Sequence, residues 1–282
     1  MKLLDSISAP GSALGGGMKP GAGDDRYVFD EEAGVACVID GATDVGAVRL
    51  FPDAESDAAR FAEIFAHELL ANPPAETESP QAYFLRFLLR LREASAMRAR
   101  HLLEDAPRSS LPTAAATWLR ARDGALESAT LGDTLAIVLS NDGTISIAGD
   151  AGKPADESAR ARKIMTLTAA KRHEWLQDLR AIHNTEAGYW IFGVEPEAAS
   201  HIVHQTLPCP PGTRALLMSD GFYRLVSPYG RHDDAQLIDL AMAQGLGALM
   251  TELRSMEADP AEDVRIGRFK TSDDATALLL EF

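Results

Sequence analysis

Short runs of apolar residues, each ended by polar or turn-forming residues, recur along the chain and predict β-strands. The runs cover residues 26–29, 35–39, 114–121, 126–131, 134–139, 144–148, 189–192, 201–207, 213–219 and 275–280. Two connections, Arg122-Asp123-Gly124 and Asn141-Asp142-Gly143, have the composition of tight hairpin turns. We therefore expect neighbouring strands to pair antiparallel, which argues against a doubly wound parallel sheet.

A second pattern places apolar residues three and four positions apart and predicts helices. It covers residues 56–70, 81–103, 155–183, 235–244 and 246–256. Residues 6–23 are instead rich in glycine, serine and proline, so we expect residues 1–23 to form an extended, mobile arm. The sequence therefore predicts one domain over residues 1–282, built from layers of strands and helices without an internal repeat.

Aspartates stand at the ends of four predicted strands. The positions are Asp24-Asp25 before residues 26–29, Asp40-Gly41 after 35–39, Asp220-Gly221 after 213–219, and Asp273-Asp274 before 275–280. A single aspartate of this kind most often caps a turn by accepting backbone N–H groups. Aspartates at one sheet edge would converge and repel one another, and hard divalent cations are the usual remedy for clustered carboxylates. The sequence therefore predicts an oxygen-only site suited to Mg²⁺ or Mn²⁺ rather than to zinc.

In this order, and together with Gly132-Asp133-Thr134 and Ser219, the segments resemble the motifs of the metal-dependent protein phosphatase family. These are the protein phosphatase 2C-like enzymes, here of the free-standing bacterial type. The matches run from about residue 23 to residue 282, so they span nearly the whole chain. The resemblance implies an α+β fold, a four-layer α-β-β-α sandwich with two antiparallel sheets and flanking helix pairs. It also implies a single phosphatase-like catalytic domain with a flap-like insertion over residues 149–188.

The same resemblance implies a serine/threonine phosphoprotein phosphatase that uses two or three Mn²⁺ or Mg²⁺ ions and a metal-bridging water. The implied metal ligands are Asp24, Asp25, Asp40, Gly41, Asp220 and Asp273. Asp40 would bridge two ions, with the Gly41 carbonyl on one of them. Asp220 and Asp273 would hold the other ion, and these two residues and Asp40 are the expected catalytic residues. Asp133 is expected to shape the sheet near the site.

The chain departs from the family pattern at two places. Ala42-Thr43-Asp44 follows Asp40-Gly41 where the family usually has a histidine or methionine and then glycines, so water would protonate the leaving group. The phosphate-binding arginine that usually precedes the acidic pair is absent. Lys19 and Arg26 are the expected replacements, although a lysine offers a point charge and not a bidentate fork. The equal alternative is that both side chains face solvent.

Composition narrows the environment and the partners. The 27 Lys and Arg residues and the 42 Asp and Glu residues give a net charge of −15, which argues against nucleic-acid binding. No apolar run approaches the roughly 18 to 20 residues that span a bilayer. Two cysteines provide no disulfide framework, as is usual in a reducing compartment. We therefore expect a cytoplasmic protein that binds neither nucleic acid nor membranes, and we expect it to be a monomer. A phosphorylated protein as its substrate is what the family resemblance implies.

Two other functions remain open from the sequence. A pseudophosphatase, which keeps the fold as a regulatory binding module, would explain the missing arginine and the altered segment after Asp40. An unrelated metal-binding or sugar-phosphate enzyme would not explain the order of the five segments. Basic residues within 149–188 are expected to attract the phosphoprotein, with a solvated helix face as the alternative. These residues are Lys153, Arg160, Arg162, Lys163, Lys171 and Arg172.

Overall fold

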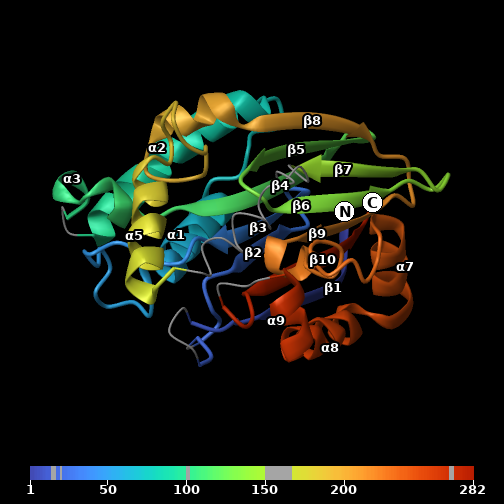
Figure 1. Cartoon of the computed structure of the whole chain (residues 1–282). Helices are drawn as coiled ribbons and strands as arrows, with labels where there is room; N and C mark the ends of the chain where they lie inside the picture. The colour runs from blue at the N-terminus through green and yellow to red at the C-terminus, as the bar shows by residue number, and fades with distance from the viewer. Residues whose placement is uncertain (14–16, 20, 100–101, 150–166, 267–269) are drawn as a thin grey trace.

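Two five-stranded antiparallel sheets lie face to face at the centre of the molecule, and helices cover their outer faces (Figure 1). The structure is a computed structural model of the 282-residue chain and describes residues 1–13, 17–19, 21–99, 102–149, 167–266 and 270–282. The four-layer α-β-β-α sandwich expected from the sequence is confirmed.

The strand order brings distant parts of the chain together. The first sheet has the order β1 (Lys2–Ala9), β10 (Ala275–Glu281), β9 (Arg214–Met218), β6 (Leu135–Leu139) and β7 (Ile145–Gly149). The second has the order β2 (Arg26–Asp30), β3 (Val35–Gly41), β4 (Ala114–Arg122), β5 (Ala125–Leu131) and β8 (Val203–Pro208). Because β1 pairs with β10, Lys2 lies opposite Glu281 and the two termini are side by side (Figure 1).

Two helix pairs form the outer layers. The pair α1 (Asp57–Ala71) and α2 (Pro80–Arg98) covers the second sheet, and the pair α7 (Asp234–Gln244) and α8 (Leu246–Glu257) covers the first. The other helices among the described residues are α3 (Leu102–Asp105), α5 (Ala169–Ala181), α6 (Asp220–Tyr223), α9 (Pro260–Ile266), and the 3₁₀ turns η1 (Arg108–Ser110) and η2 (Pro196–His201). No helix in the described ranges combines the length and apolar character that crossing a bilayer requires.

Three apolar clusters hold the layers together, and the two-residue period of the strands explains them. In β3, Cys37 and Ile39 pack against α1 and α2, whereas Ala36 and Val38 pack against the other sheet. Both faces of β3 are therefore buried, which is why residues 35–39 form an uninterrupted apolar run. The third cluster lies between the first sheet and the α7–α8 pair.

Two segments differ from the sequence-based expectations. Residues 2–9, expected within a mobile arm, form β1; Asp5 hides the strand pattern because the pairing shifts there and its carboxylate accepts the Leu246 N–H of α8 at 2.8 Å. Residues 189–192, expected to be a strand, make an isolated bridge between Ala114 and Phe192. The Tyr189 carbonyl accepts a hydrogen bond from the Asn184 N–H at 3.0 Å, within the same loop and not from a strand. The predicted helix over 155–183 is described only from residue 169, and residues 155–166 lie outside the described residues.

A buried threonine cluster links the two sheets beside the acidic strand ends. The Thr117 hydroxyl on β4 lies 3.0 Å from the Thr130 hydroxyl, 2.9 Å from the Thr134 hydroxyl and 2.8 Å from the Thr134 carbonyl. All three residues are buried. Since Thr134 leads into β6 of the other sheet, these bonds fix the turn that carries Asp133.

Replacing Thr117 by valine should therefore lower the free energy of unfolding by about 1–3 kcal/mol, because buried polar atoms lose a partner while the side-chain shape is kept. Chemical denaturation with matched wild-type protein measures the change. Thr206→Val, at an exposed position of β8, is the control and should stay within about 0.5 kcal/mol of wild type. Equal stabilities of all three proteins would contradict the role given to this cluster.

Candidate metal centre

The acidic strand ends meet at one end of the sandwich. In the second sheet, Arg26 pairs with Ile39, so Asp25 and Asp40 lie at the same edge. In the first sheet, Ala277 pairs with Met218, which places the residues after β9 beside those before β10. Asp220 and Asp273 are therefore neighbours. Four strands of two sheets thus contribute carboxylates to one place.

Asp25 is the most deeply buried of these carboxylates that lacks a counterion. It is 1% exposed, and neither of its oxygens has a hydrogen-bond partner among the described residues. Burial, with the nearby charge of Asp274, raises the pKa of Asp25 to about 8, although the hydroxyls of Ser219 and Thr276 lie near enough to oppose this in part. A buried carboxylate without a partner is costly, so this position is suited to a cation.

Asp40 lies at the centre of the acidic cluster. Its pKa is raised well above the ordinary value by burial first, and then by the charges of Asp25, Asp220, Asp133 and Asp273. Because the charge of Asp133 contributes to the raised pKa of Asp40, Asp133 lies near Asp40. The next residue, Gly41, has space for no side chain, since a Cβ there would lie 2.6 Å from the carbonyl oxygen of Asp24.

Asp24 and Asp274 share one lysine. The ammonium of Lys19 contacts Oδ2 of both aspartates, and the three side chains are nearly inaccessible to solvent. Burial opposes the charge of Lys19, but the two carboxylates outweigh it and raise the pKa of the lysine. Of the two basic residues expected to bind phosphate, Lys19 thus reaches the acidic centre.

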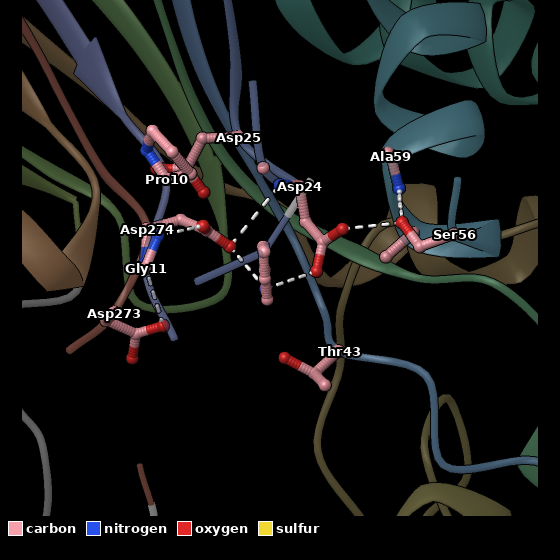
Figure 2. Close-up of polar contacts among 12 residues, drawn as sticks. Pro10, Gly11, Asp24, Asp25, Thr43, Ser56, Ala59, Asp273 and Asp274 are labelled. Carbon is pink, nitrogen blue, oxygen red and sulfur yellow. Dashed lines mark hydrogen bonds and ion pairs between the residues drawn. The ribbon is translucent and has the colours of Figure 1, made fainter. Parts of the chain in front are cut away.

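Further bonds fix these two aspartates in position (Figure 2). Oδ1 of Asp274 accepts the Gly11 N–H at 2.7 Å, and Oδ2 accepts the Asp24 N–H at 3.3 Å. On the other side, the Ser56 hydroxyl donates to Oδ1 of Asp24 at 2.5 Å and accepts the Ala59 N–H at 2.9 Å as the cap of α1. Asp24 is therefore hydrogen-bonded both to Asp274, just before β10, and to Ser56, the cap of α1.

Asp273 has cations of its own. Lys270 contacts Oδ1, and Arg224 Nη2 lies 3.1 Å from Oδ2. Burial opposes ionisation of Asp273, but the charges of Lys270 and Arg224 outweigh it and hold the pKa below the ordinary value. Glu257, which is 2% exposed, orients this group because it contacts Arg224 at 3.3 Å and accepts the Asp273 N–H at 3.2 Å.

Arg26 has a different environment from Lys19. Its guanidinium donates to the carbonyls of Gly23 at 2.9 Å and Asp25 at 2.6 Å, and pairs with Glu63 of α1 at 2.9 Å. These contacts brace the turn that carries the acidic pair. Arg26 thus contacts the backbone and Glu63, whereas Lys19 contacts Asp24 and Asp274.

The segment after Gly41 supports its neighbours through the backbone. The Asp44 carboxylate accepts the N–H groups of Asp57 at 2.8 Å and Ala58 at 3.0 Å at the start of α1. From α5, Arg180 donates to the Thr43 carbonyl at 3.0 Å. Part of the predicted flap thus docks on the loop that follows Asp40. Of the six basic residues assigned to substrate attraction, Lys171 and Arg172 lie on α5, and Lys153, Arg160, Arg162 and Lys163 lie outside the described residues.

The donor set fits hard divalent cations. Within the described residues no three acidic, histidine or cysteine side chains form a ready coordination shell. Asp24, Asp273 and Asp274 contact lysine or arginine side chains there. The donors are nonetheless all oxygens, and the unpartnered carboxylate of Asp25 lies among them. Sequence reasoning missed Lys270, Arg224 and Glu257. The available signal was the spacing of Lys270 three residues before Asp273.

The end of α5 generates a pH prediction. Burial, and then the charge of Arg180, lowers the pKa of His183 to about 4 from 6.5. The unfolded chain therefore binds more protons between these values, so stability present above pH 6.5 is lost as the pH falls. From pH 7 to 5, wild type should lose about 2 kcal/mol more unfolding free energy than His183→Gln.

Urea denaturation at both pH values measures this difference. His67→Gln, at a side chain 66% exposed, is the control and should follow wild type. An identical pH response of His183→Gln and wild type would contradict the assignment of a neutral, half-buried His183.

Comparison with known proteins supports the fold. No family model and no curated protein matches the sequence. Among solved structures, the photosystem II phosphatase PBCP is 13% identical, with 99% of this chain and 97% of that chain covered and a TM-score of 0.57. The PPM Ser-Thr phosphatase MsPP from Mycobacterium smegmatis is 17% identical, with full coverage of both chains and a TM-score of 0.51. The catalytic domain of the serine/threonine phosphatase PstP, solved with two manganese ions, is 13% identical, with 98% and 96% covered and a TM-score of 0.50. The chain has the protein phosphatase 2C-like fold of the PPM-type serine/threonine phosphatases.

Proposed function

We propose that this protein is a metal-dependent phosphomonoester hydrolase that acts on phosphoserine and phosphothreonine in proteins. The observation that carries the proposal is the buried carboxylate of Asp25, which has no hydrogen-bond partner among the described residues and lies beside the carboxylates of Asp40, Asp220 and Asp273. The fold supports the reaction class, since the solved structures that share it include serine/threonine phosphatases. From the sequence, we place the enzyme in the cytoplasm as a monomer.

The proposed ligands are the residues that the strand ends bring together. Asp40 and the Gly41 carbonyl would hold one ion, Asp40, Asp220 and Asp273 the second, and Asp24 and Asp25 would complete the shells. When bound, two Mn²⁺ or Mg²⁺ ions supply an activated water nucleophile and neutralise charge on the phosphate. A third ion stays part of the proposal without a residue assigned to it.

The chain's own groups hold this arrangement in place. Ser56 and Lys19 fix the two oxygens of Asp24. Arg224 and Glu257 fix the carboxylate and the backbone of Asp273. The loop at residues 42–44 offers no imidazole to protonate the leaving alkoxide, so a water molecule takes this role in the proposal.

A second candidate function is a binding module without catalysis. The observation that favours it is the pairing of lysine ammonium groups with Asp24, Asp273 and Asp274, because these pairs satisfy carboxylates that a catalytic centre uses for metal. Such a protein would recognise phosphoproteins or regulators without hydrolysing them. Metal dependence of activity separates the two functions.

Hydrolysis of para-nitrophenyl phosphate should require added Mn²⁺ or Mg²⁺ and stop in excess chelator. Asp40→Asn and Asp220→Asn should each lower kcat/KM roughly 100- to 1,000-fold, because a metal ligand contributes several kcal/mol to the stabilisation of charge. Asp239→Asn, at an exposed position of α7, is the matched control and should keep wild-type activity. Full activity in chelator would refute the metal mechanism, and no activity with any of the ions would favour the binding module.

The substrate class has a separate test. Phosphoserine and phosphothreonine peptides should be hydrolysed with a higher kcat/KM than small phosphorylated metabolites of equal charge, because a protein phosphatase binds the flanking chain. Malachite-green detection of released phosphate measures both series. Activity confined to a small metabolite would show that the reaction class is right and the protein substrate is wrong.

A further inference from the structure

The positively charged groups around the acidic centre fall into two kinds. Arg224 is held by two acids, Asp273 at 3.1 Å and Glu257 at 3.3 Å, so its guanidinium is fixed in the scaffold. Lys19 and Lys270 are on loops outside helices and strands, at the ends of flexible stems. Both ammonium groups are buried as well, with 9% of the Lys19 side chain and 11% of the Lys270 side chain exposed, so the two lysines differ from Arg224 in their place on loops and in their flexible stems.

Lys19 is placed where a cation of the centre would be needed. Its ammonium contacts Asp24, which precedes β2 of the second sheet, and Asp274, which precedes β10 of the first. The lysine side chain is 9% exposed. Oδ1 of Asp274 is separately bonded to the Gly11 N–H, and Oδ1 of Asp24 to the Ser56 hydroxyl (Figure 2). Both aspartates would therefore stay in position if the lysine moved away.

Lys270 repeats this arrangement at Asp273. Its ammonium contacts Oδ1 of Asp273 and lies 3.3 Å from the Thr43 hydroxyl, with the lysine side chain 11% exposed. The charge of Lys19 opposes that of Lys270, so the two ammonium groups are close enough to repel each other. Two cations thus share a space in which a divalent ion would repel both.

Asp25 and Asp40 lie beside these pairs, and no described lysine or arginine forms an ion pair with either of them. A cation at the centre would stabilise the ionised forms of these two carboxyls, while Lys19 and Lys270 neutralise the outer oxygens of Asp24, Asp273 and Asp274 around them. The uncompensated and the compensated carboxylates are parts of one cluster, since Asp273 and Asp274 contribute to the raised pKa of Asp25. Metal binding and lysine binding therefore exclude each other at the outer oxygens.

We propose that Lys19 and Lys270 are internal competitors of the divalent cations. In the metal-free protein they neutralise Asp24, Asp273 and Asp274, and a metal ion binds fully only when it displaces them. This inference rests on the proposed metal centre. The two lysines therefore lower the affinity of the site for the metal ion, because the ion must break ion pairs that are already formed and sheltered from solvent.

Isothermal titration calorimetry of metal-stripped protein with MnCl₂ measures the Kd for Mn²⁺ and tests the proposal without any assay of activity. Lys19→Met and Lys270→Met keep the apolar stem and remove the charge, so each should bind Mn²⁺ about tenfold or more tightly than wild type. Lys19→Arg keeps the charge and should remain close to wild type. Lys171→Met, at an exposed position of α5, is the control for loss of a distant positive charge.

Each result has a distinct meaning. Tighter binding by the two methionine variants alone supports the proposal. Unchanged or weaker binding overturns it and leaves the metal-dependent function intact. Binding that is seen only after the lysines are replaced supports the competition and refutes native metal-dependent activity. Absence of Mn²⁺ binding in every variant overturns both the competition and the metal centre.

A measurement on wild-type protein covers the case in which a variant does not fold. Reductive methylation of lysines, with and without Mn²⁺, is read by peptide mass spectrometry. Modification of Lys19 and Lys270 should rise several-fold when Mn²⁺ is present, because their ammonium groups leave the carboxylates, while Lys171 should not change. If bound Mn²⁺ leaves Lys19 and Lys270 as protected as before, displacement is excluded.

Discussion

Repulsion among carboxylates at the end of the sandwich is the constraint on which the rest of this structure depends. Asp25, Asp40, Asp220 and Asp273 are brought together by strand pairing, and burial raises the free energy of every ionised oxygen among them. The surrounding segments answer this constraint with cations and N–H donors. The loop at residues 17–19, the first turn of α1 and the residues before β10 are all arranged around these carboxylates.

The carboxylates of the site differ in how far cations and N–H donors offset their charge. Asp273 and Asp274 have firmly placed partners, whereas Asp25 has none among the described residues. Buried ion pairs add little net stability, because desolvation of both charges offsets their attraction. Their value here is geometric, since Arg224 and Glu257 give Asp273 one orientation. The scaffold thus keeps the cluster ordered while leaving the Asp25 carboxyl at its centre without a partner among the described residues.

The sequence predicted the features that depend on local pattern. Alternation and hairpin turns are local, so β4, β5, β6 and β7 were found nearly to the residue. The acidic positions were found because each follows or precedes an apolar run. Arg224 and Glu257 were missed because they lie 49 and 16 residues from Asp273 along the chain, and no spacing links them. The strand β1 was missed because Asp5, whose carboxylate accepts the Leu246 N–H of α8, interrupts the alternation of apolar and polar residues.

The pairing of β1 with β10 has a consequence for the order of folding. Ala9 pairs with Ala275, so this contact closes a loop that contains almost every other element. Such long-range pairing is slow, because the entropy of loop closure is lost before the contact forms. During synthesis, β1 leaves the ribosome before the other strands of its sheet and stays without its partner until residues 275–281 emerge. The hairpins β4–β5 and β6–β7 close early, whereas the acidic centre, which needs residues 24 and 274 together, is among the last parts to assemble.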